Sequence, residues 1–123
     1  ELHTLADKLH ARAPDLRLHE DGELLILPGG EAVVPDLRLE RADGSAVRIE
    51  LFHRWHRHAL ARRLDQLAAG AAPDLVLGVD RGLARLAEVA PLLDGEVATA
   101  RCFLFSGYPS LTAVRRLAAT GGR

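Results

Sequence analysis

The fold predicted for this chain depends most on residues 33–55, which read VVPDLRLERADGSAVRIELFHRW. Apolar and polar side chains alternate on both sides of a central Ala-Asp-Gly segment, which is the pattern of two half-buried β-strands. Strands are expected at residues 33–41 and 46–53, each with one wholly apolar face. The segment therefore predicts a β-hairpin with one acid on the polar face of each strand, Asp36 and Glu50.

The length of the turn decides whether these two acids meet. A two-residue Asp43-Gly44 loop would put the apolar row of one strand beside the polar row of the other, so that register is set aside. A three-residue loop with Gly44 in the left-handed conformation places Asp36 opposite Glu50, with Cβ atoms roughly 5 Å apart. A register slipped by two residues would instead form ordinary cross-strand ion pairs, with Arg38 facing Glu50. From these residues alone, both registers stay open.

Length and composition restrict the class of protein. A chain of 123 residues is expected to form one domain over residues 1–123 that buries about two-thirds of its unfolded surface. The single cysteine, Cys102, lies in an apolar run and is expected to be a buried free thiol in a reducing cytoplasm. No run approaches the roughly 18 apolar residues of a membrane span and no signal peptide opens the chain, so a cytoplasmic location without a membrane partner is predicted. The chain starts at Glu1 and contains no methionine, so we expect it to be part of a longer protein.

The remaining segments predict an alternation of helices and strands. A first helix is striped by Leu2, Leu5 and Leu9 and is closed by Pro14. Strands are then expected at 16–19 and 24–27, a helix at 57–69, a strand at 75–79, a helix at 84–93 bent near its proline, a strand at 99–105 and a final helix at 110–120. The first four strands are expected to form an antiparallel meander.

Residues 53–63, HRWHRHALARR, are the one basic stretch, with four arginines, three histidines and no acid. One interpretation is a helix with a solvated arginine face. The other is a stripe that steers a phosphate backbone toward the acids, in which Arg57, Arg62 and Arg63 bind DNA. Trp55 is expected in the core, and joins the DNA-binding residues as a stacking surface if it is exposed.

The order of these segments resembles that of the PD-(D/E)xK nucleases, in particular the nuclease domain of the archaeal endonuclease that partners the XPB helicase, a family with bacterial members. The likeness covers nearly the whole chain: an acid opening the first helix at Glu1, LRLHEDGELLIL at 16–27, VVPDLRLERADG at 33–44, VRIELFHRW at 47–55, PDLVLGVD at 73–80 and CFLFSGYP at 102–109. It implies a restriction-endonuclease-like α/β fold: a mixed sheet flanked by helices, with an α-β-β-β-α-β core, extra strands and a C-terminal helix.

The activity implied by the resemblance is that of a metal-dependent, structure-specific DNA endonuclease module acting with an XPB-like superfamily 2 helicase in DNA repair or processing. Its substrates would be branched DNA, bubbles, or junctions of single and double strands. Asp36, Glu50 and the Leu51 carbonyl would hold Mg²⁺ or Mn²⁺, and Glu1 could hold a metal-bound water. The lysine of the superfamily pattern, two residues after the glutamate, is Phe52 here.

Other residues compete for roles at this site. Arg54 and Lys8 are the candidates to supply the cation that the missing lysine would provide. A zinc site of His53, His56, His58 and Cys102 is disfavoured by its spacing and by the lack of a second cysteine. Asp80 is expected to cap the following helix rather than to border the site.

Two further functional classes stay open. One is a catalytically degenerate nuclease fold that binds DNA or a helicase without cutting, which the substitution of the lysine by Phe52 makes plausible. The other is an unrelated small α/β domain in which Asp36 and Glu50 are surface ion-pair partners.

Overall fold

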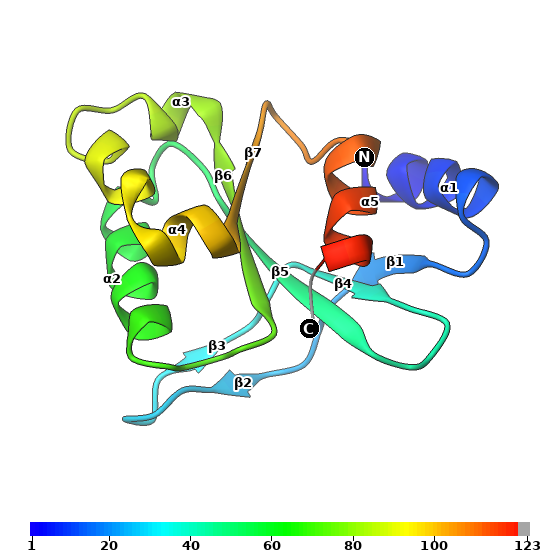
Figure 1. Ribbon diagram of the computed structural model, residues 1–123, viewed down its shortest axis with the longest axis horizontal. Coiled ribbons are helices and arrows are strands. Elements are labelled where there is room, and N and C mark those ends of the chain that lie inside the picture. Colours follow the sequence, from blue (N-terminus) through cyan, green and yellow to red (C-terminus); the bar gives the residue numbers. More distant parts are fainter. Residues whose placement is uncertain (121–123) are drawn as a thin grey trace.

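A computed structural model describes residues 1–120 of the chain, and its centre is a five-stranded mixed β-sheet (Figure 1). The strands lie in the order β1-β4-β5-β6-β7. Their bounds are Arg17–Glu20 for β1, Leu37–Glu40 for β4, Ala46–Phe52 for β5, Leu75–Asp80 for β6 and Cys102–Phe105 for β7. β1, β4 and β5 are antiparallel neighbours, whereas β6 and β7 continue the sheet parallel to β5. The predicted α/β fold with a mixed sheet flanked by helices is confirmed.

β2 (Leu25–Ile26) and β3 (Ala32–Val33) pair with each other in a separate two-stranded ribbon. The predicted meander is therefore wrong, because β1 pairs with β4 rather than with β2. The strand predicted at 33–41 is also divided, with β3 before Pro35 and β4 after it. Proline has no N–H to donate to a strand ladder, which explains a break at this position.

The β4–β5 hairpin has the three-residue turn that the sequence predicts. Gly44 adopts a φ of +88°, and the Arg41 N–H donates to the Ser45 carbonyl at 2.8 Å across the turn. The register pairs Leu37 with Ile49, Arg38 with Arg48, Leu39 with Val47 and Glu40 with Ala46. The slipped register, in which Arg38 would face Glu50, is thereby excluded.

Helices cover both faces of the sheet (Figure 1). α1 (Leu2–Arg12) and α5 (Leu111–Thr120) lie against each other on one face, and α2 (Arg57–Ala68) and α4 (Glu96–Arg101) lie on the other. Because both faces are covered, the residues of β6 from Leu75 to Val79 are all buried, as their continuous apolar sequence predicts. None of the helices within residues 1–120 is both long and apolar enough to cross a membrane.

The spacing of leucines explains how α2 packs. Leu60, Leu64 and Leu67 recur every three or four residues, so they share one side of the helix. All three are buried in one core cluster with Phe52 of β5. This packing sets α2 beside the strand that carries Glu50.

The segment between β6 and β7 differs most from the prediction. Instead of one bent helix at 84–93, it contains α3 (Arg81–Ala84) and a 3₁₀-helix at Ala90–Asp94 that begins just before its proline. Proline lacks the N–H that an α-helix interior requires, so it suits the start of a short turn. The strand predicted from residue 99 begins only at Cys102. The preceding residues complete α4, where the Thr99 hydroxyl donates to the Gly95 carbonyl at 2.9 Å.

A buried ion pair fastens β5 to the chain before β2. Arg48 Nε donates to Asp21 Oδ2 at 2.7 Å, and Arg48 Nη2 donates to Asp21 Oδ1 at 3.2 Å and to the Glu23 carbonyl at 2.6 Å. The Asp21 side chain is only 1% exposed. Burial opposes its ionisation, yet the hydrogen bonds and charge of Arg48 outweigh burial and hold the pKa of Asp21 below its ordinary value. The pair is therefore charged at neutral pH.

Candidate functional site

Asp36 is fixed against the two neighbours of Glu50 on β5. The Asp36 N–H donates to the Ile49 carbonyl at 2.8 Å, and the Leu51 N–H donates to Asp36 Oδ2 at 2.7 Å. The Asp21 N–H donates to the Asp36 carbonyl at 3.2 Å from the other side. The regular pairing of β4 and β5 ends one residue before Asp36, at Leu37 and Ile49. The backbone thus places the Asp36 side chain beside Glu50, as the predicted register requires.

The two acids line one open hollow of about 300 Å³. Its lining residues are Val34, Asp36, Glu50, Leu51, Phe52, His56 and Ala59. They come from β5, from the segment that leads into β4, and from the turn and first residues of α2. The hollow is therefore where Asp36 and Glu50 are both available to a ligand.

Glu50 already has a cationic partner, which is Arg63 of α2. Arg63 Nε donates to Glu50 Oε1 at 2.8 Å and Arg63 Nη2 donates to Glu50 Oε2 at 3.2 Å, a two-bond arrangement that matches the planar guanidinium to the carboxylate. The Arg63 side chain is 9% exposed and that of Glu50 is 15% exposed. This ion pair is therefore largely shielded from water.

Further polar groups hold Arg63 in place. Its Nη1 donates to Gln66 Oε1 and, at 3.4 Å, to Glu31 Oε2, while Gln66 Nε2 donates to Glu31 Oε1 at 2.9 Å. Burial lowers the pKa of Arg63, but the bonds and charges of Glu50 and Glu31 outweigh burial and raise it. Arg63 is therefore a permanent cation beside Glu50.

Phe52 occupies the position at which the PD-(D/E)xK pattern has lysine, and it supplies no charge there. Its side chain is 2% exposed and packs in the core with Leu60 and Leu64 of α2. An apolar ring suits this buried contact with the helix. The cation bound to Glu50 thus comes from α2, through Arg63, rather than from β5.

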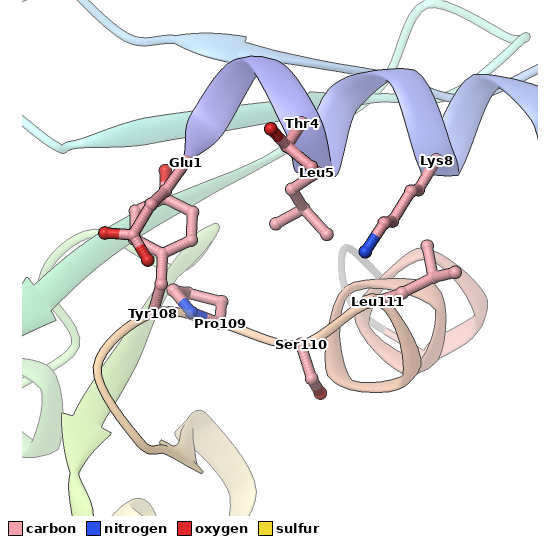
Figure 2. A pocket seen from close by; sticks show the side chains of 8 residues that line it. All are labelled: Glu1, Thr4, Leu5, Lys8, Tyr108, Pro109, Ser110 and Leu111. Carbon is pink, nitrogen blue, oxygen red and sulfur yellow. The ribbon is translucent and has the colours of Figure 1, made fainter.

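The predicted catalytic residues Glu1 and Lys8 lie at a different hollow, of about 440 Å³. It is lined by Glu1, Thr4, Leu5, Lys8, Tyr108, Pro109, Ser110 and Leu111. Figure 2 shows both side chains reaching from α1 toward the segment that leads into α5, with Glu1 near Tyr108 and Lys8 near Leu111. Neither residue lines the hollow of Asp36 and Glu50.

Tyr108 lines the hollow of Glu1 and Lys8. Burial raises the pKa of its phenol, and the negative charges of Glu1, Asp36 and Glu20 raise it further. These acids come from separate segments: Glu1 precedes α1, Glu20 ends β1 and Asp36 precedes β4. In the sequence, Tyr108 is marked only by its place in the CFLFSGYP segment.

Arg54 lies outside the hollow of the two acids. β5 ends at Phe52, so Arg54 belongs to the turn that follows. Its aliphatic carbons lie close to the backbone of Gly82 in α3, where a Cβ atom would be 3.0 Å from Arg54 Cδ. Arg54 is therefore an exposed residue that packs against α3 and does not line the hollow of Asp36 and Glu50.

Three of the four arginines of the basic stretch have acidic partners in space that the sequence segment lacks. Arg57 Nη1 lies 3.3 Å from Glu88 Oε1, Arg62 Nη2 lies 2.6 Å from Glu31 Oε1, and Arg63 is bound to Glu50. Arg57 and Arg62 remain exposed on α2, whereas Arg63 is buried. The role of the three residues in DNA binding stays a prediction, with Arg63 placed inside the protein rather than on its surface.

The spacing of α2 contained a signal for the position of Arg63. It lies three residues after Leu60 and one before Leu64, so it falls on the buried side of the helix. A long cation on that side requires a buried acid, and Glu50 is the acid that the neighbouring strand offers.

One secondary expectation is confirmed, one holds in part and one is wrong. Asp80 caps α3, since its Oδ1 accepts from the Gly82 N–H at 2.7 Å. Cys102 is a free thiol but is half-buried rather than buried, and this partial burial raises the pKa of the thiol to about 11. Trp55, in contrast, is 75% exposed rather than part of the core.

The donor set for a metal ion is small. Within residues 1–120, no group of three or more His, Cys, Asp or Glu side chains is arranged to hold an ion, which also leaves the disfavoured zinc site without support. An ion in the 300 Å³ hollow would depend on Asp36, Glu50 and the backbone oxygen of Leu51. Oxygen donors of this kind suit Mg²⁺ or Mn²⁺, and Arg63 is the cation with which such an ion would compete for Glu50.

Comparisons with known proteins give a distant likeness to a solved structure. No protein-family model matches the chain, and no curated protein matches its sequence. Among solved structures it is similar to the crystal structure of a repair endonuclease from Pyrococcus abyssi, with a TM-score of 0.40 and 15% sequence identity over 89% of this chain. The matched region is 48% of that protein, so the present chain spans about half its length. A likeness this distant does not transfer an activity to the chain.

Proposed function

We propose that this chain is a metal-dependent DNA endonuclease module of the PD-(D/E)xK type. The observation that carries the proposal is the placement of Asp36 beside Glu50 in one open hollow at the β4–β5 hairpin. Two carboxylates that line one hollow repel each other unless a proton or cation lies nearby. An acid pair with an open side toward solvent is therefore suited to bind a cation and a phosphate together.

Asp36, Glu50 and the Leu51 carbonyl would hold Mg²⁺ or Mn²⁺. When bound, such an ion lowers the pKa of a coordinated water and neutralises charge that develops on the phosphodiester. The residues of the chain contribute orientation: the Leu51 N–H holds one oxygen of Asp36, and Arg63 holds Glu50 from the α2 side. Glu1, Lys8 and Arg54 retain their proposed catalytic roles only if substrate extends from this hollow over the neighbouring surfaces.

A second candidate function is a degenerate nuclease fold that binds DNA or a helicase without cutting. Two observations favour it. Phe52 removes the lysine of the motif, and the two-bond pair with Arg63 already neutralises Glu50. In this form the Arg63 guanidinium would serve the structural role of the cation, and no divalent ion would be needed.

Metal-dependent stability separates the two candidates. Wild-type protein is melted in chelator and in millimolar MnCl₂, and is then incubated with bubble and branched DNA. The endonuclease predicts about 2.7 kcal/mol of stabilisation at a hundredfold excess of metal over Kd, together with nicking of the DNA. Asp36→Asn and Glu50→Gln should lose both effects, whereas Asp65→Asn, the same chemical change at an exposed position of α2, should keep both.

Other outcomes of these experiments distinguish the two candidate functions. A wild type that binds DNA, ignores Mn²⁺ and leaves the DNA intact supports the degenerate module and contradicts the nuclease. Binding to an XPB-like helicase is a further part of the proposal, and rests on the resemblance alone. Pull-down of an XPB-like helicase with this chain tests that part, and a failure to retain the helicase would remove it.

A further inference from the structure

Trp55 is a large aromatic side chain that is left on the surface. It lies in the turn between β5 and α2 and is 75% exposed. Tryptophan usually buries most of its surface, because its ring has the largest apolar area of any side chain. An indole that stays exposed beside a candidate active site therefore calls for a ligand.

The ring is supported from behind. The imidazole of His53 stacks on the indole with ring centroids 5.1 Å apart and planes inclined by 18°. Phe105 of β7 also contacts the His53 ring edge-on, with centroids 5.6 Å apart and planes inclined by 81°, and the backbone N–H of His53 donates to His56 Nδ1 at 2.9 Å. With one face against His53 and most of its surface accessible, the indole presents its opposite face to solvent. A flat ligand would meet a surface whose orientation is already set.

The stack lies next to the acid pair. His56 tilts against Trp55 with centroids 5.4 Å apart, and His56 also lines the hollow of Asp36 and Glu50. A ligand stacked on Trp55 therefore extends into the region where the acids would bind a phosphodiester.

Positive charge adjoins the ring. Arg54, the residue before Trp55, is exposed and forms no ion pair among the residues that the structure describes. Arg81 is also exposed at the start of α3, next to the Gly82 backbone against which Arg54 packs. A flat aromatic face bordered by unneutralised arginine is the combination that binds a base and its phosphate. A neutral apolar partner would gain nothing from this charge.

We propose that Trp55, backed by His53, is a stacking platform for an unpaired base of single-stranded DNA, with Arg54 on a flanking phosphate. The proposal deepens the proposed function, on which it rests, by naming the substrate: a strand with an unpaired base beside the acid pair. Base pairs inside a duplex have both faces covered by their neighbours, so a duplex would have to extrude a base before it could stack here. Stacking on an aromatic ring tolerates any base, so sequence preference should be weak.

Trp55 is the only tryptophan of the chain, so its fluorescence reports this platform alone. Wild-type protein is titrated in chelator, where hydrolysis cannot occur, with three ligands of equal length: oligothymidylate, the same backbone with abasic sites, and a blunt duplex. Oligothymidylate should quench and shift the emission. The abasic strand, which has the same phosphates and no bases, and the duplex should change it far less.

Variants give a second measurement. By anisotropy of labelled oligothymidylate, Trp55→Ala should weaken binding roughly 5- to 100-fold, whereas Trp55→Tyr should retain part of the affinity. Ile26→Ala removes another exposed apolar side chain, 62% accessible on β2, and should bind like wild type. Arg54→Ala should lower the slope of log affinity against log salt by about one.

Several results would overturn the platform. In the fluorescence assay, these are equal quenching by the abasic strand and by oligothymidylate. In the binding assay, they are tighter binding of the duplex than of oligothymidylate, or unchanged affinity of Trp55→Ala. If no DNA changes the fluorescence or binds, a protein partner is left as the occupant of the surface. Because the titration contains no metal, it is independent of catalysis. Loss of Mn²⁺ binding with intact quenching contradicts the nuclease, while intact nicking without quenching contradicts the platform.

Discussion

Replacement of Arg63 by methionine tests how the acid pair is neutralised. Methionine approximates the length and apolar stem of arginine but removes the guanidinium that holds both oxygens of Glu50. The variant leaves a carboxylate that is only 15% exposed without its cation. We expect lower stability in chelator and a larger response to Mn²⁺ than in wild type.

The expected loss of folding stability in Arg63→Met follows from the burial of Glu50. Removing one partner of a buried ion pair costs about 3 to 5 kcal/mol, because the other charge stays desolvated. Glu50 borders an open hollow, so water can reach it and the cost should fall at the lower end, about 3 kcal/mol. For a domain of this size, that loss lowers the melting temperature by on the order of 10 °C. A divalent ion replaces the lost charge, so a hundredfold excess over Kd should return about 2.7 kcal/mol.

Thermal melts of four proteins measure the prediction: wild type, Arg63→Met, Glu50→Gln, and the double variant, each with and without Mn²⁺. The double variant has no unpaired charge, so it should be no less stable than Arg63→Met, and the two changes should be strongly non-additive. Arg63→Lys keeps a charge but not the two-bond geometry, and should lie between wild type and Arg63→Met. The reasoning is refuted if Arg63→Met melts within about 0.5 kcal/mol of wild type in chelator, or if Mn²⁺ stabilises both proteins equally.

Two further predictions concern the buried groups. Asp21→Asn should cost about 3 kcal/mol at pH 7, because it leaves Arg48 buried without its carboxylate. Since the folded-state pKa of Asp21 is lowered from 3.8, this contribution is complete above that value and shrinks as the pH falls through the lower folded pKa. Urea unfolding of wild type and variant at pH 7 and pH 3 checks the sign, and a larger difference at pH 3 would contradict it. Cys102, whose pKa is raised to about 11 by burial, should react with iodoacetamide at pH 8 far more slowly in native protein than in denaturant. Mass spectrometry measures the labelling, and equal rates would show that the thiol is accessible.

The β4–β5 hairpin could be predicted from the sequence because its signals are local. Alternation fixes which face of each strand is buried, and Gly44 supplies the one positive φ that a three-residue turn requires. Together these leave only the registers that keep apolar side chains on one face. The placement of Asp36 near Glu50 follows from that register, so the main element of the site was accessible from sequence.

The rest of the site depends on packing between distant segments. Arg63 reaches Glu50 only because the leucines of α2 set the helix beside β5, and the partner of Arg57 comes from the segment after α3. A basic stretch without acids in sequence is thus largely neutralised in space. Trp55 was expected in the core, but it lies in the turn between β5 and α2 with its side chain 75% exposed.

The position of β5 in the sheet limits how far its backbone can move when a ligand binds to the acid pair. It is hydrogen-bonded on one edge to β4 and on the other to β6, and most of its residues are buried. The amide hydrogens of such a central strand exchange with solvent only when a large part of the protein unfolds. In D₂O, the backbone amides of β5 should therefore be among the last to exchange. Adaptation to a bound ion must then come from the side chains of Arg63 and Gln66, whose rotation leaves the strand undisturbed.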